Sequence, residues 1–381
     1  MTQLHFPNSI IIKPVGSFCN LNCDYCFYLS KNNLYEGDSS RHRMSANILE
    51  KIIKEMFIHS NEPSFIWHGG EPTLMGFDFL TQIISFQKKY SNGKKYHNSI
   101  QTNGFFLSTT WMDFLKNENF LVGVSLDGPE HVHDYYRKTK KGRSTFEKVY
   151  KNVKILQKKG VLFNILATVN NYSVNYPKEI YNFFVDNEFY YMQFSPVLEQ
   201  DPNNINKAAN FSVDSNDYGV FLYELFKLWI NDFDFSHLKQ KTSIRFFDNI
   251  MQLYIGIIPD HCMLHKNCNQ YLVIEHNGDF YSCDYLVSNE TKIGNINNIS
   301  IFQAFNSKSH IEFGNQKSNI NEKCKKCMWL KLCYGGCIKD RIKDKRDNGH
   351  NHFCNSNKYF FSRTHEQFKK LAYLYNKYYK N

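Results

Sequence analysis

The sequence predicts an α/β fold in which six βα repeats form an open, partial barrel. Short runs of β-type residues recur along the first half of the chain, and segments with helical periodicity lie between them. Alternating strands and helices indicate a parallel sheet, and six repeats are too few for a closed eight-stranded barrel. The predicted strands are Ser9–Val15, Ser64–His68, Asn98–Thr102, Leu121–Leu126, Leu162–Val169 and Tyr191–Val197.

The predicted helices between these strands are amphipathic. Residues Ser45–His59 place their apolar side chains on one face, at the spacing typical of a helix that covers a sheet. Ser144 and Glu147 have the spacing of a capping box, and Gly160 is a plausible end for the helix that would begin there. Pro177 suits the first turn of a further helix.

The second part of the chain has a different pattern. Residues 199–216 lose periodicity, as an insertion or linker would, and residues 218–230 then predict a helix that closes the first domain. Farther on, Asn277-Gly278 lies between two β-type runs, which predicts a hairpin with a type I′ turn. We therefore expect a partial-barrel domain over residues 1–232 and a smaller cysteine-rich domain with a C-terminal helix over residues 233–381.

Composition limits the function classes. The chain has 381 residues, 42% of them hydrophobic, and shows neither a signal peptide nor an apolar run approaching the roughly 18 residues of a membrane span. Its 11 cysteines, without a secretion signal, argue against a disulfide framework and for the reducing cytoplasm. The net charge of +10 comes from scattered lysines without interleaved aromatic residues, so neither a nucleic acid nor a membrane is an expected partner.

The strongest motif follows the first strand, where Cys19, Cys23 and Cys26 are spaced C-x3-C-x2-C. Three thiolates on one loop can hold three irons of a [4Fe–4S] cluster and leave the fourth iron open for a reaction. A structural zinc site would need a fourth ligand to close its coordination sphere, and no Cys or His follows nearby. The spacing therefore favours a cluster over zinc.

Polar and glycine residues also follow the next strands. Gly69-Gly70-Glu71 comes after the second strand, Asn103 after the third, and Ser125-Leu126-Asp127 ends the fourth. The carboxyl ends of parallel strands meet at one edge of the sheet, where ligands bind in such folds. These residues therefore predict one site around the cysteine loop, although Glu71 alone fits a tight turn before a helix equally well.

The other eight cysteines all lie between residues 262 and 354. Eight thiols divide into two sets of four, which suit two further clusters or two zinc ions, because four-cysteine sites for either metal share C-x2-C elements. Spacing alone does not pair them. They are Cys262, Cys268, Cys283, Cys324, Cys327, Cys333, Cys337 and Cys354.

These motifs together resemble the radical S-adenosylmethionine (SAM) enzymes that carry a SPASM domain. The strings CNLNCDYCFYL, GGEPTL, QTNG, LVGVSLDGP, VIEHNGDFYSCDY and CYGGC are most similar to those of the anaerobic sulfatase-maturating enzymes, and the resemblance covers nearly the whole chain. It implies a radical SAM barrel in which the open iron binds SAM and an electron from the cluster generates a 5′-deoxyadenosyl radical.

The resemblance also implies roles for particular residues. Gly69, Gly70 and Glu71 would hold the amino group of SAM, while Ser125, Asp127 and Arg137 would lie near its ribose and methionine parts. Tyr28 would lie near the adenosyl end, where it either orients the substrate or only packs. One auxiliary [4Fe–4S] cluster would be bound by Cys262, Cys268, Cys283 and Cys337, and the other by Cys324, Cys327, Cys333 and Cys354.

Asp284 directly follows Cys283, and by the same resemblance it would be the general base of the reaction. Removing a hydrogen atom from a Cys or Ser β-carbon leaves a radical, which must lose a proton and an electron to reach the aldehyde level; a carboxylate can take the proton. The alternative is a turn aspartate that binds backbone N–H groups. His68 stands where the maturases usually have Gln.

Three functions follow from these patterns. The first is oxidation of a Cys or Ser in an unfolded sulfatase C/S-x-P-x-R segment to Cα-formylglycine, with three [4Fe–4S] clusters, SAM and an electron donor such as flavodoxin or ferredoxin. The second is a SPASM-type enzyme that forms thioether or carbon–carbon crosslinks in a precursor peptide. The third is a zinc-rich binding protein, which would contain two or three zinc ions in place of about twelve irons.

Overall fold

The computed structural model of the protein describes residues 6–35, 42–237 and 239–379. Its chain divides into two compact units, each assembled from separate stretches of sequence. The first unit contains Met1–Ser125, Lys138–Phe163 and Asn269–Asn315, and the second contains Leu126–Arg137, Asn164–Cys268 and Gln316–Asn381.

The first unit is built on a sheet whose strand order is β4-β3-β2-β1-β12-β13-β14. Neighbouring strands from β4 to β12 run parallel, and β13 and β14 are antiparallel additions. The pairing of β1 with β12 joins the N-terminal strand to a hairpin more than 250 residues later in the chain. These strands are β1 (Ser9–Lys13), β2 (Ser64–Trp67), β3 (His97–Thr102), β4 (Leu121–Ser125), β12 (Leu272–Glu275), β13 (Asp279–Tyr281) and β14 (Lys292–Asn295).

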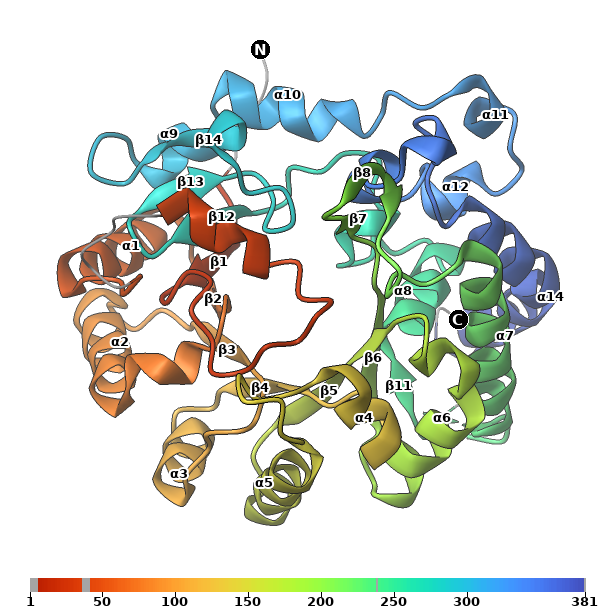
Figure 1. Ribbon diagram of the computed structural model, residues 1–381, viewed down its shortest axis with the longest axis horizontal. Helices are drawn as coiled ribbons and strands as arrows, with labels where there is room; N and C mark the ends of the chain where they lie inside the picture. Colours follow the sequence, from red (N-terminus) through yellow and green to blue (C-terminus); the bar gives the residue numbers. More distant parts are fainter. Residues whose placement is uncertain (1–5, 36–41, 238, 380–381) are drawn as a thin grey trace. The chain divides into compact units, whose positions relative to one another are not determined.

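Helices of the first unit follow the strands in the βα order that the sequence predicts (Figure 1). Helix α1 buries the apolar face expected of it, and Ser45 caps its N-terminus by accepting the N–H of Ile48. The helices are α1 (Ala46–His59), α2 (Phe77–Tyr90), α3 (Thr109–Asn117), α5 (Phe146–Lys159), α9 (Ile301–Phe305) and α10 (Lys308–Gln316).

Two local predictions in this unit are wrong. Helix α5 begins after Thr145, which makes no side-chain capping bond, so the predicted capping box of Ser144 and Glu147 does not form. Its predicted end at Gly160 is confirmed, with φ of 68°. The hairpin turn is closed by the Gly278 N–H bonding to the Glu275 carbonyl at 2.8 Å, and only Gly278 of the Asn-Gly pair has positive φ. A type I′ turn needs positive φ at both residues, so the turn is of another type.

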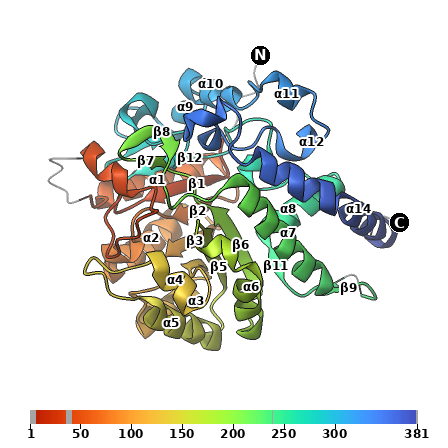
Figure 2. The ribbon, with the colours of Figure 1, turned by 45° about the vertical axis from the view of Figure 1, so that its right-hand side comes forward.

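The second unit contains the remaining parallel strands, in the order β11-β6-β5. Figure 2 shows the long C-terminal helix α14 lying along α7, and Phe226 of α7 packs against Phe360 and Phe368 of α14. The elements are β5 (Phe163–Val169), β6 (Tyr191–Pro196), β11 (Ser243–Ile244), α4 (Glu130–Tyr136), α6 (Pro177–Asp186), α7 (Ser215–Asn231), α8 (Arg245–Tyr254) and α14 (Cys354–Tyr379).

The aperiodic stretch 199–216 is not a plain linker. It contains a small hairpin of β7 (Gln200–Asp201) and β8 (Asn204–Ala208), and Asp344 accepts the N–H of Ala208. Strand β7 has only two residues and β8 is mostly polar, so a search for apolar periodicity does not find them. Other short elements of this unit include β9 (Phe233–Asp234), β10 (Lys239–Gln240), α11 (Glu322–Lys325), α12 (Leu330–Cys333) and α13 (Lys339–Ile342).

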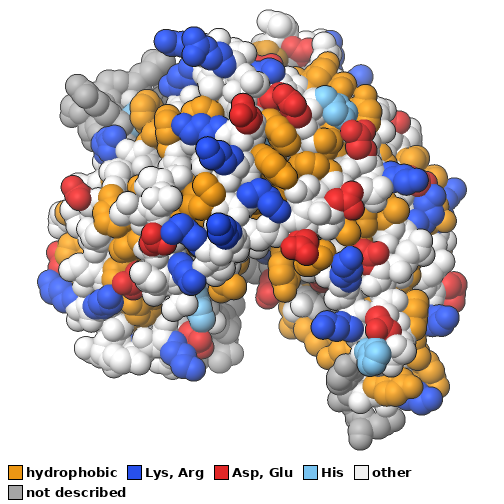
Figure 3. All heavy atoms as spheres, turned by 90° about the horizontal axis from the view of Figure 1, so that it is seen from below, with side chains coloured by type: hydrophobic (Ala, Val, Ile, Leu, Met, Phe, Trp, Pro, Cys, Tyr) orange, Lys and Arg blue, Asp and Glu red, His pale blue; other side chains and the backbone are white. Residues whose placement is uncertain are grey.

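The surface agrees with the scattered charge of the sequence. On the face drawn in Figure 3, Lys and Arg side chains lie among acidic, polar and apolar ones. Among the described residues, no helix is both long enough and apolar enough to cross a membrane.

Gly219 generates a stability prediction for the second unit. A Cβ at this position of α7 would lie 2.9 Å from the Cα of Ser356 in α14, so the two helices approach too closely for any side chain. We expect Gly219→Ala to lower the thermal unfolding midpoint by several degrees, although alanine is the better helix former by about 1 kcal/mol. Val220→Ala, at an exposed position one residue along, is the control and should change the midpoint little. A stabilised Gly219→Ala variant would contradict this packing.

Candidate cluster and cofactor sites

The first three cysteines lie in one loop directly after β1. The Cys26 N–H bonds to the Cys23 carbonyl at 2.9 Å, which closes a turn between the second and third cysteines. The Leu21 N–H points at the sulfur of Cys19, 3.4 Å away. Burial raises the pKa of the Cys19 thiol to about 11. A thiol with that pKa stays protonated in the protein alone, so it would bind a metal by releasing its proton.

The glycine pair is folded tightly against this loop. The Gly70 N–H bonds to the Gly16 carbonyl at 2.7 Å, and a Cβ on Gly70 would lie 2.0 Å from the carbonyl oxygen of Phe18. Gly69 has φ of 124°, a conformation that residues with side chains rarely adopt. Only glycines therefore allow the end of β2 to touch the cysteine loop.

Glu71 is fully buried and holds this region together. Its Oε1 accepts the Thr73 N–H at 3.0 Å and the Thr102 hydroxyl at 2.8 Å. Its Oε2 accepts the backbone N–H of Asn103 at 2.7 Å. Burial nevertheless raises the pKa of this carboxyl. Glu71 thus serves as the cap of the short Pro72–Met75 turn of helix, as the structural alternative predicted, and it also bonds to the end of β3.

Asn103 contributes more than its sequence context suggested. Its side-chain amide lies 2.9 Å from Asn20 Oδ1 and 3.6 Å from the sulfur of Cys19. Hydrogen bonds to cysteine sulfur are one way in which a protein tunes a cluster. The only signal for this role in the sequence is the position of Asn103 at the carboxyl end of a strand.

Asp127 and Arg137 form a buried pair within the second unit, while Ser125 ends β4 of the first unit. The guanidinium binds Asp127 through two hydrogen bonds of 2.8 and 3.0 Å, and Thr168 adds its N–H and hydroxyl. Burial raises the pKa of Asp127, but the Arg137 charge and these bonds outweigh it, so the pKa lies below its ordinary value. The SAM contacts of these residues stay predictions.

Asp284 belongs to a buried group of charged side chains in the first unit. The ammonium of Lys13, whose side chain is completely buried, lies 3.5 Å from Asp284 Oδ2. It also lies 2.5 Å from His68 Nδ1 and 4.8 Å from the centre of the Tyr28 ring. The Tyr28 hydroxyl donates to Glu275, which is fully buried as well. The alternative that Asp284 only binds backbone N–H groups in a turn is therefore insufficient, because the buried ammonium of Lys13 lies beside its carboxylate.

Lys13 was not predicted as a site residue. Burial lowers the pKa of Lys13 below its ordinary value, and the charges of Asp284 and Glu275 offset only part of this effect. Burial and the nearby Lys13 lower the pKa of His68 to about 3, so its imidazole is neutral and can accept a hydrogen bond from the ammonium. A lysine at the end of an apolar β-strand, directly before Pro14, was the available sequence signal.

The first of the two predicted auxiliary sets is divided between the two units. Cys262, Cys268 and Cys337 belong to the second unit, whereas Cys283 follows β13 of the first. Lys317 is buried near the first three, and its ammonium donates to the carbonyls of Cys262 and Met263 at 2.8 Å each.

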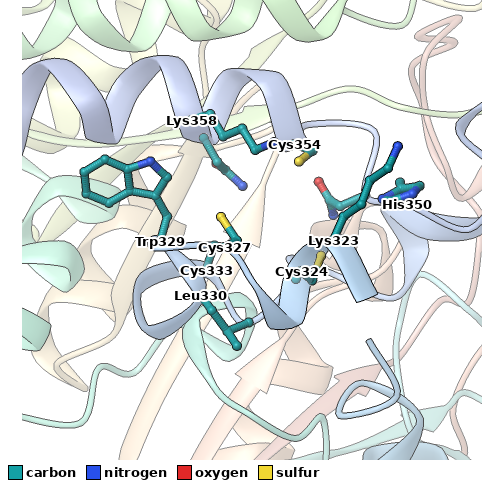
Figure 4. A pocket seen from close by; sticks show the side chains of 12 residues that line it. Lys323, Cys324, Cys327, Trp329, Leu330, Cys333, His350, Cys354 and Lys358 are labelled. Atoms are coloured by element: carbon teal, nitrogen blue, oxygen red, sulfur yellow. The ribbon is translucent and has the colours of Figure 1, made fainter. Parts of the chain in front are cut away.

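The other predicted set forms a visible cavity. Cys324, Cys327, Cys333 and Cys354 line one pocket, with Trp329 on one side and Lys323 and His350 on the other (Figure 4). Burial raises the pKa of Cys333 to about 11. Arg341 lies nearby, donates to the backbone carbonyls of Tyr334 and Gly335, and interacts electrostatically with both auxiliary groups of cysteines in this unit.

The distances between the sulfurs bear on the choice between a zinc ion and a cluster. Sulfurs bound to one zinc ion at about 2.3 Å lie within about 4.6 Å of one another. Within the part of the chain that the structure describes, one trio of His, Cys, Asp or Glu ligand atoms lies within 4.8 Å, namely Asp344, Asp347 and His352, and no trio of cysteines does. The described cysteines therefore do not lie at the sulfur separations of an assembled zinc site.

His68 generates a prediction about pH. Its ordinary pKa of 6.5 applies in the unfolded chain, so between about pH 6.5 and 3 the unfolded chain takes up a proton that the folded protein excludes. Stability from this residue is complete above that range and falls as the pH drops through it. We expect His68→Gln to weaken the loss of stability between pH 7 and pH 5 in urea unfolding, with His97→Gln at an exposed position as control. Equal pH dependence in all three proteins would contradict a neutral His68.

Comparison with known proteins agrees with this geometry. The Radical SAM superfamily model matches residues 14–184, and the model of an iron-sulfur cluster-binding domain, SPASM, matches residues 262–328. The chain is 38% identical over 366 residues to the serine-type anaerobic sulfatase-maturating enzyme of Bacteroides thetaiotaomicron, covering 91% of this chain and 87% of the relative. It is 38% identical over 371 residues to the cysteine-type enzyme of Clostridium novyi, covering 96% of each.

Solved structures give the same answer. The native anSMEcpe structure with bound AdoMet and Cp18Cys peptide has a TM-score of 0.85 and 32% identity, and the match covers 96% of this chain and 98% of that one. Streptococcus suis SuiB bound to the precursor peptide SuiA matches with a TM-score of 0.62 and 18% identity, over 89% of this chain and 74% of that one, which shows the fold alone. The predicted radical SAM barrel with a SPASM domain is thereby confirmed, and the chain belongs to the anaerobic sulfatase-maturating enzymes of the radical SAM superfamily.

Proposed function

We propose that this protein oxidises a Cys or Ser in the C/S-x-P-x-R segment of an unfolded sulfatase to Cα-formylglycine. The observation that carries the proposal is the buried Asp284, which directly follows a predicted cluster ligand and faces the ammonium of Lys13 at 3.5 Å. Relatives named as serine-type and as cysteine-type maturases match equally well, at 38% identity each, so both residues remain possible targets.

Eleven cysteines would hold three [4Fe–4S] clusters in this proposal. Cys19, Cys23 and Cys26 would bind the radical-site cluster within residues 1–232, and the eight later cysteines would bind two auxiliary clusters within residues 233–381. Gly69, Gly70 and Glu71, with Ser125, Asp127, Arg137 and Tyr28, would form the SAM site. When bound, SAM and the clusters would supply hydrogen-atom abstraction and one-electron transfer.

The chain's own contribution is to place a base. Once the substrate β-carbon has lost a hydrogen atom, it must release one proton and one electron to reach the aldehyde or thioaldehyde level. Asp284 would accept the proton on its carboxylate. Lys13 places its ammonium 3.5 Å from that carboxylate and so helps to hold it in position. The electron would pass to an auxiliary cluster, and a carrier such as flavodoxin or ferredoxin would exchange electrons with the protein.

The function is tested with two peptides that contain C-x-P-x-R and S-x-P-x-R. Iron-reconstituted protein is incubated anaerobically with SAM, dithionite and each peptide, and the products are read by mass spectrometry. Formation of aldehyde together with 5′-deoxyadenosine supports the proposal and identifies the target residue. If 5′-deoxyadenosine forms while both peptides stay unchanged, the substrate assignment is wrong, and crosslinking of a precursor peptide becomes the reading to test.

Asp284→Asn tests the assignment of the base. The amide keeps the shape of the side chain but cannot take the proton, so we expect aldehyde formation to fall by at least 100-fold, within the usual range for a lost general base. Formation of 5′-deoxyadenosine should stay close to that of the unmodified protein. Asp217→Asn, at an exposed position of α7, is the matched control. Aldehyde at the normal rate in Asp284→Asn would remove Asp284 from the mechanism.

Metal content tests the cluster assignment. The reconstituted protein should contain about twelve irons and equal acid-labile sulfide, by four irons for each cluster. Cys283→Ala should lose about four of them, and Cys23→Ala should abolish SAM cleavage while it keeps the auxiliary eight. Two or three zinc ions in place of iron, or full iron content in Cys283→Ala, would overturn the ligand sets.

A further inference from the structure

The pocket formed by Cys324, Cys327, Cys333 and Cys354 opens at the protein surface. Its lining includes Lys323 and Lys358, which are both exposed, and Figure 4 shows them at the edge of the space that the four cysteines surround. A redox group held by these cysteines would therefore lie next to solvent. An electron carrier can approach such a group without any movement of the chain.

Lysines are concentrated around this opening. Four exposed lysines and one glutamate lie between Glu322 and Lys331, and Glu322 is already paired with Lys325 at 2.6 Å. Met328 lies in the middle of this run, next to Cys327, and is 79% exposed. We call this surface the lysine collar; it consists of Lys323, Lys325, Lys326, Met328, Lys331 and Lys358.

Some lysines of the collar would neutralise the negative charge of a cluster bound in the pocket, but this role does not account for all of them. Lys323 and Lys358 line the pocket, and Arg341 and Lys358 both act on the thiol of Cys324. Lys325, Lys326 and Lys331 do not line the pocket. Among the described residues, neither Lys326 nor Lys331 takes part in a salt bridge. The charges of Lys326 and Lys331 are therefore available to a binding partner.

An exposed apolar side chain flanked by lysines suits a transient complex between proteins. Complexes of redox proteins bury little surface, and complementary charge speeds their formation. A basic surface selects an acidic partner. An acidic carrier would place its redox group near the cysteine pocket if its charges met the lysines around Met328.

We propose that the lysine collar is the docking surface for an acidic one-electron carrier protein of the flavodoxin or ferredoxin class. In each encounter the reduced carrier loses one electron, the group held by the four cysteines gains it, and no covalent bond forms or breaks. The proposal rests on the proposed function for the presence of a redox group in this pocket, but not on the identity of the peptide substrate.

The test compares two sets of charge reversals. Lys325→Glu, Lys326→Glu and Lys331→Glu are combined in one variant, because none of these residues lines the pocket. Lys151→Glu, Lys158→Glu and Lys178→Glu on helices α5 and α6 are combined in the control, which has the same net charge and exposed positions. Binding of a purified acidic bacterial flavodoxin is measured anaerobically at 50 and 300 mM salt, together with the rate at which its hydroquinone reduces the clusters.

We expect the collar variant to bind flavodoxin at least tenfold more weakly than the unmodified protein at 50 mM salt and to be reduced more slowly. The control should bind within twofold of the unmodified protein, whose affinity should itself fall at 300 mM salt. Equal binding by the collar variant and the unmodified protein, or equal weakening in the control, overturns the proposal.

Two measurements separate this outcome from other failures. If the collar variant has lost iron, flavodoxin binding is compared instead between the unmodified protein and the milder combination Lys325→Gln, Lys326→Gln and Lys331→Gln. Weaker binding by this combination supports the proposal, and equal binding overturns it. Aldehyde formation with dithionite, which needs no carrier protein, should be the same in the collar variant and the unmodified protein. A collar-dependent affinity without any peptide oxidation would leave the docking surface standing and reject only the sulfatase substrate.

Discussion

The buried carboxylate of Glu71 connects the parts of the first site. It accepts hydrogen bonds from the chain after β2 and from the end of β3, while its own N–H bonds to the Phe18 carbonyl of the cysteine loop at 2.9 Å. A buried carboxylate is tolerated only when donors surround it. The three segments must therefore be in place together, and the close contact of Gly70 with Phe18 follows from the same arrangement. The geometry of this candidate site therefore depends on the hydrogen bonds of Glu71 as well as on the cysteines.

Local patterns predicted the strands and most helices, because the spacing of apolar residues, every second residue in a strand and every 3.6 residues in a helix, is visible in the sequence. All six predicted strands occur within two residues of their expected bounds. Predictions failed where a helix begins one residue later than its expected cap, as at Thr145, or where elements are two residues long, as in β7. The parallel pairing of β1 with β12 also escaped prediction, since no local signal reports which distant strand lies beside an edge.

The candidate site could be predicted only in part for a related reason. Cysteine spacing and strand-end motifs identify residues that donate ligands, but the cations that accompany them are single residues without a motif. Lys13, Lys317 and Arg341 are recognisable only from their contacts in the folded chain. All three bring positive charge near thiols or carboxylates that would be negative with metal bound. Buried cations of this kind offset the charge that iron–sulfur binding adds to a site with low dielectric constant.

Lys13 also bears on how the hairpin finds its place in the sheet. It lies opposite Glu275 in the β1–β12 register, and both side chains are completely buried. A slip of one residue would turn the ammonium to the other face of the sheet and leave the Glu275 carboxylate without it. Lys13 forms its salt bridge with Asp284 at 3.5 Å, and the charge of Glu275 adds to the attraction. A buried charge that loses its partner costs on the order of 3–5 kcal/mol. We therefore expect these buried charges to disfavour alignments of the hairpin that separate Asp284 from its cation.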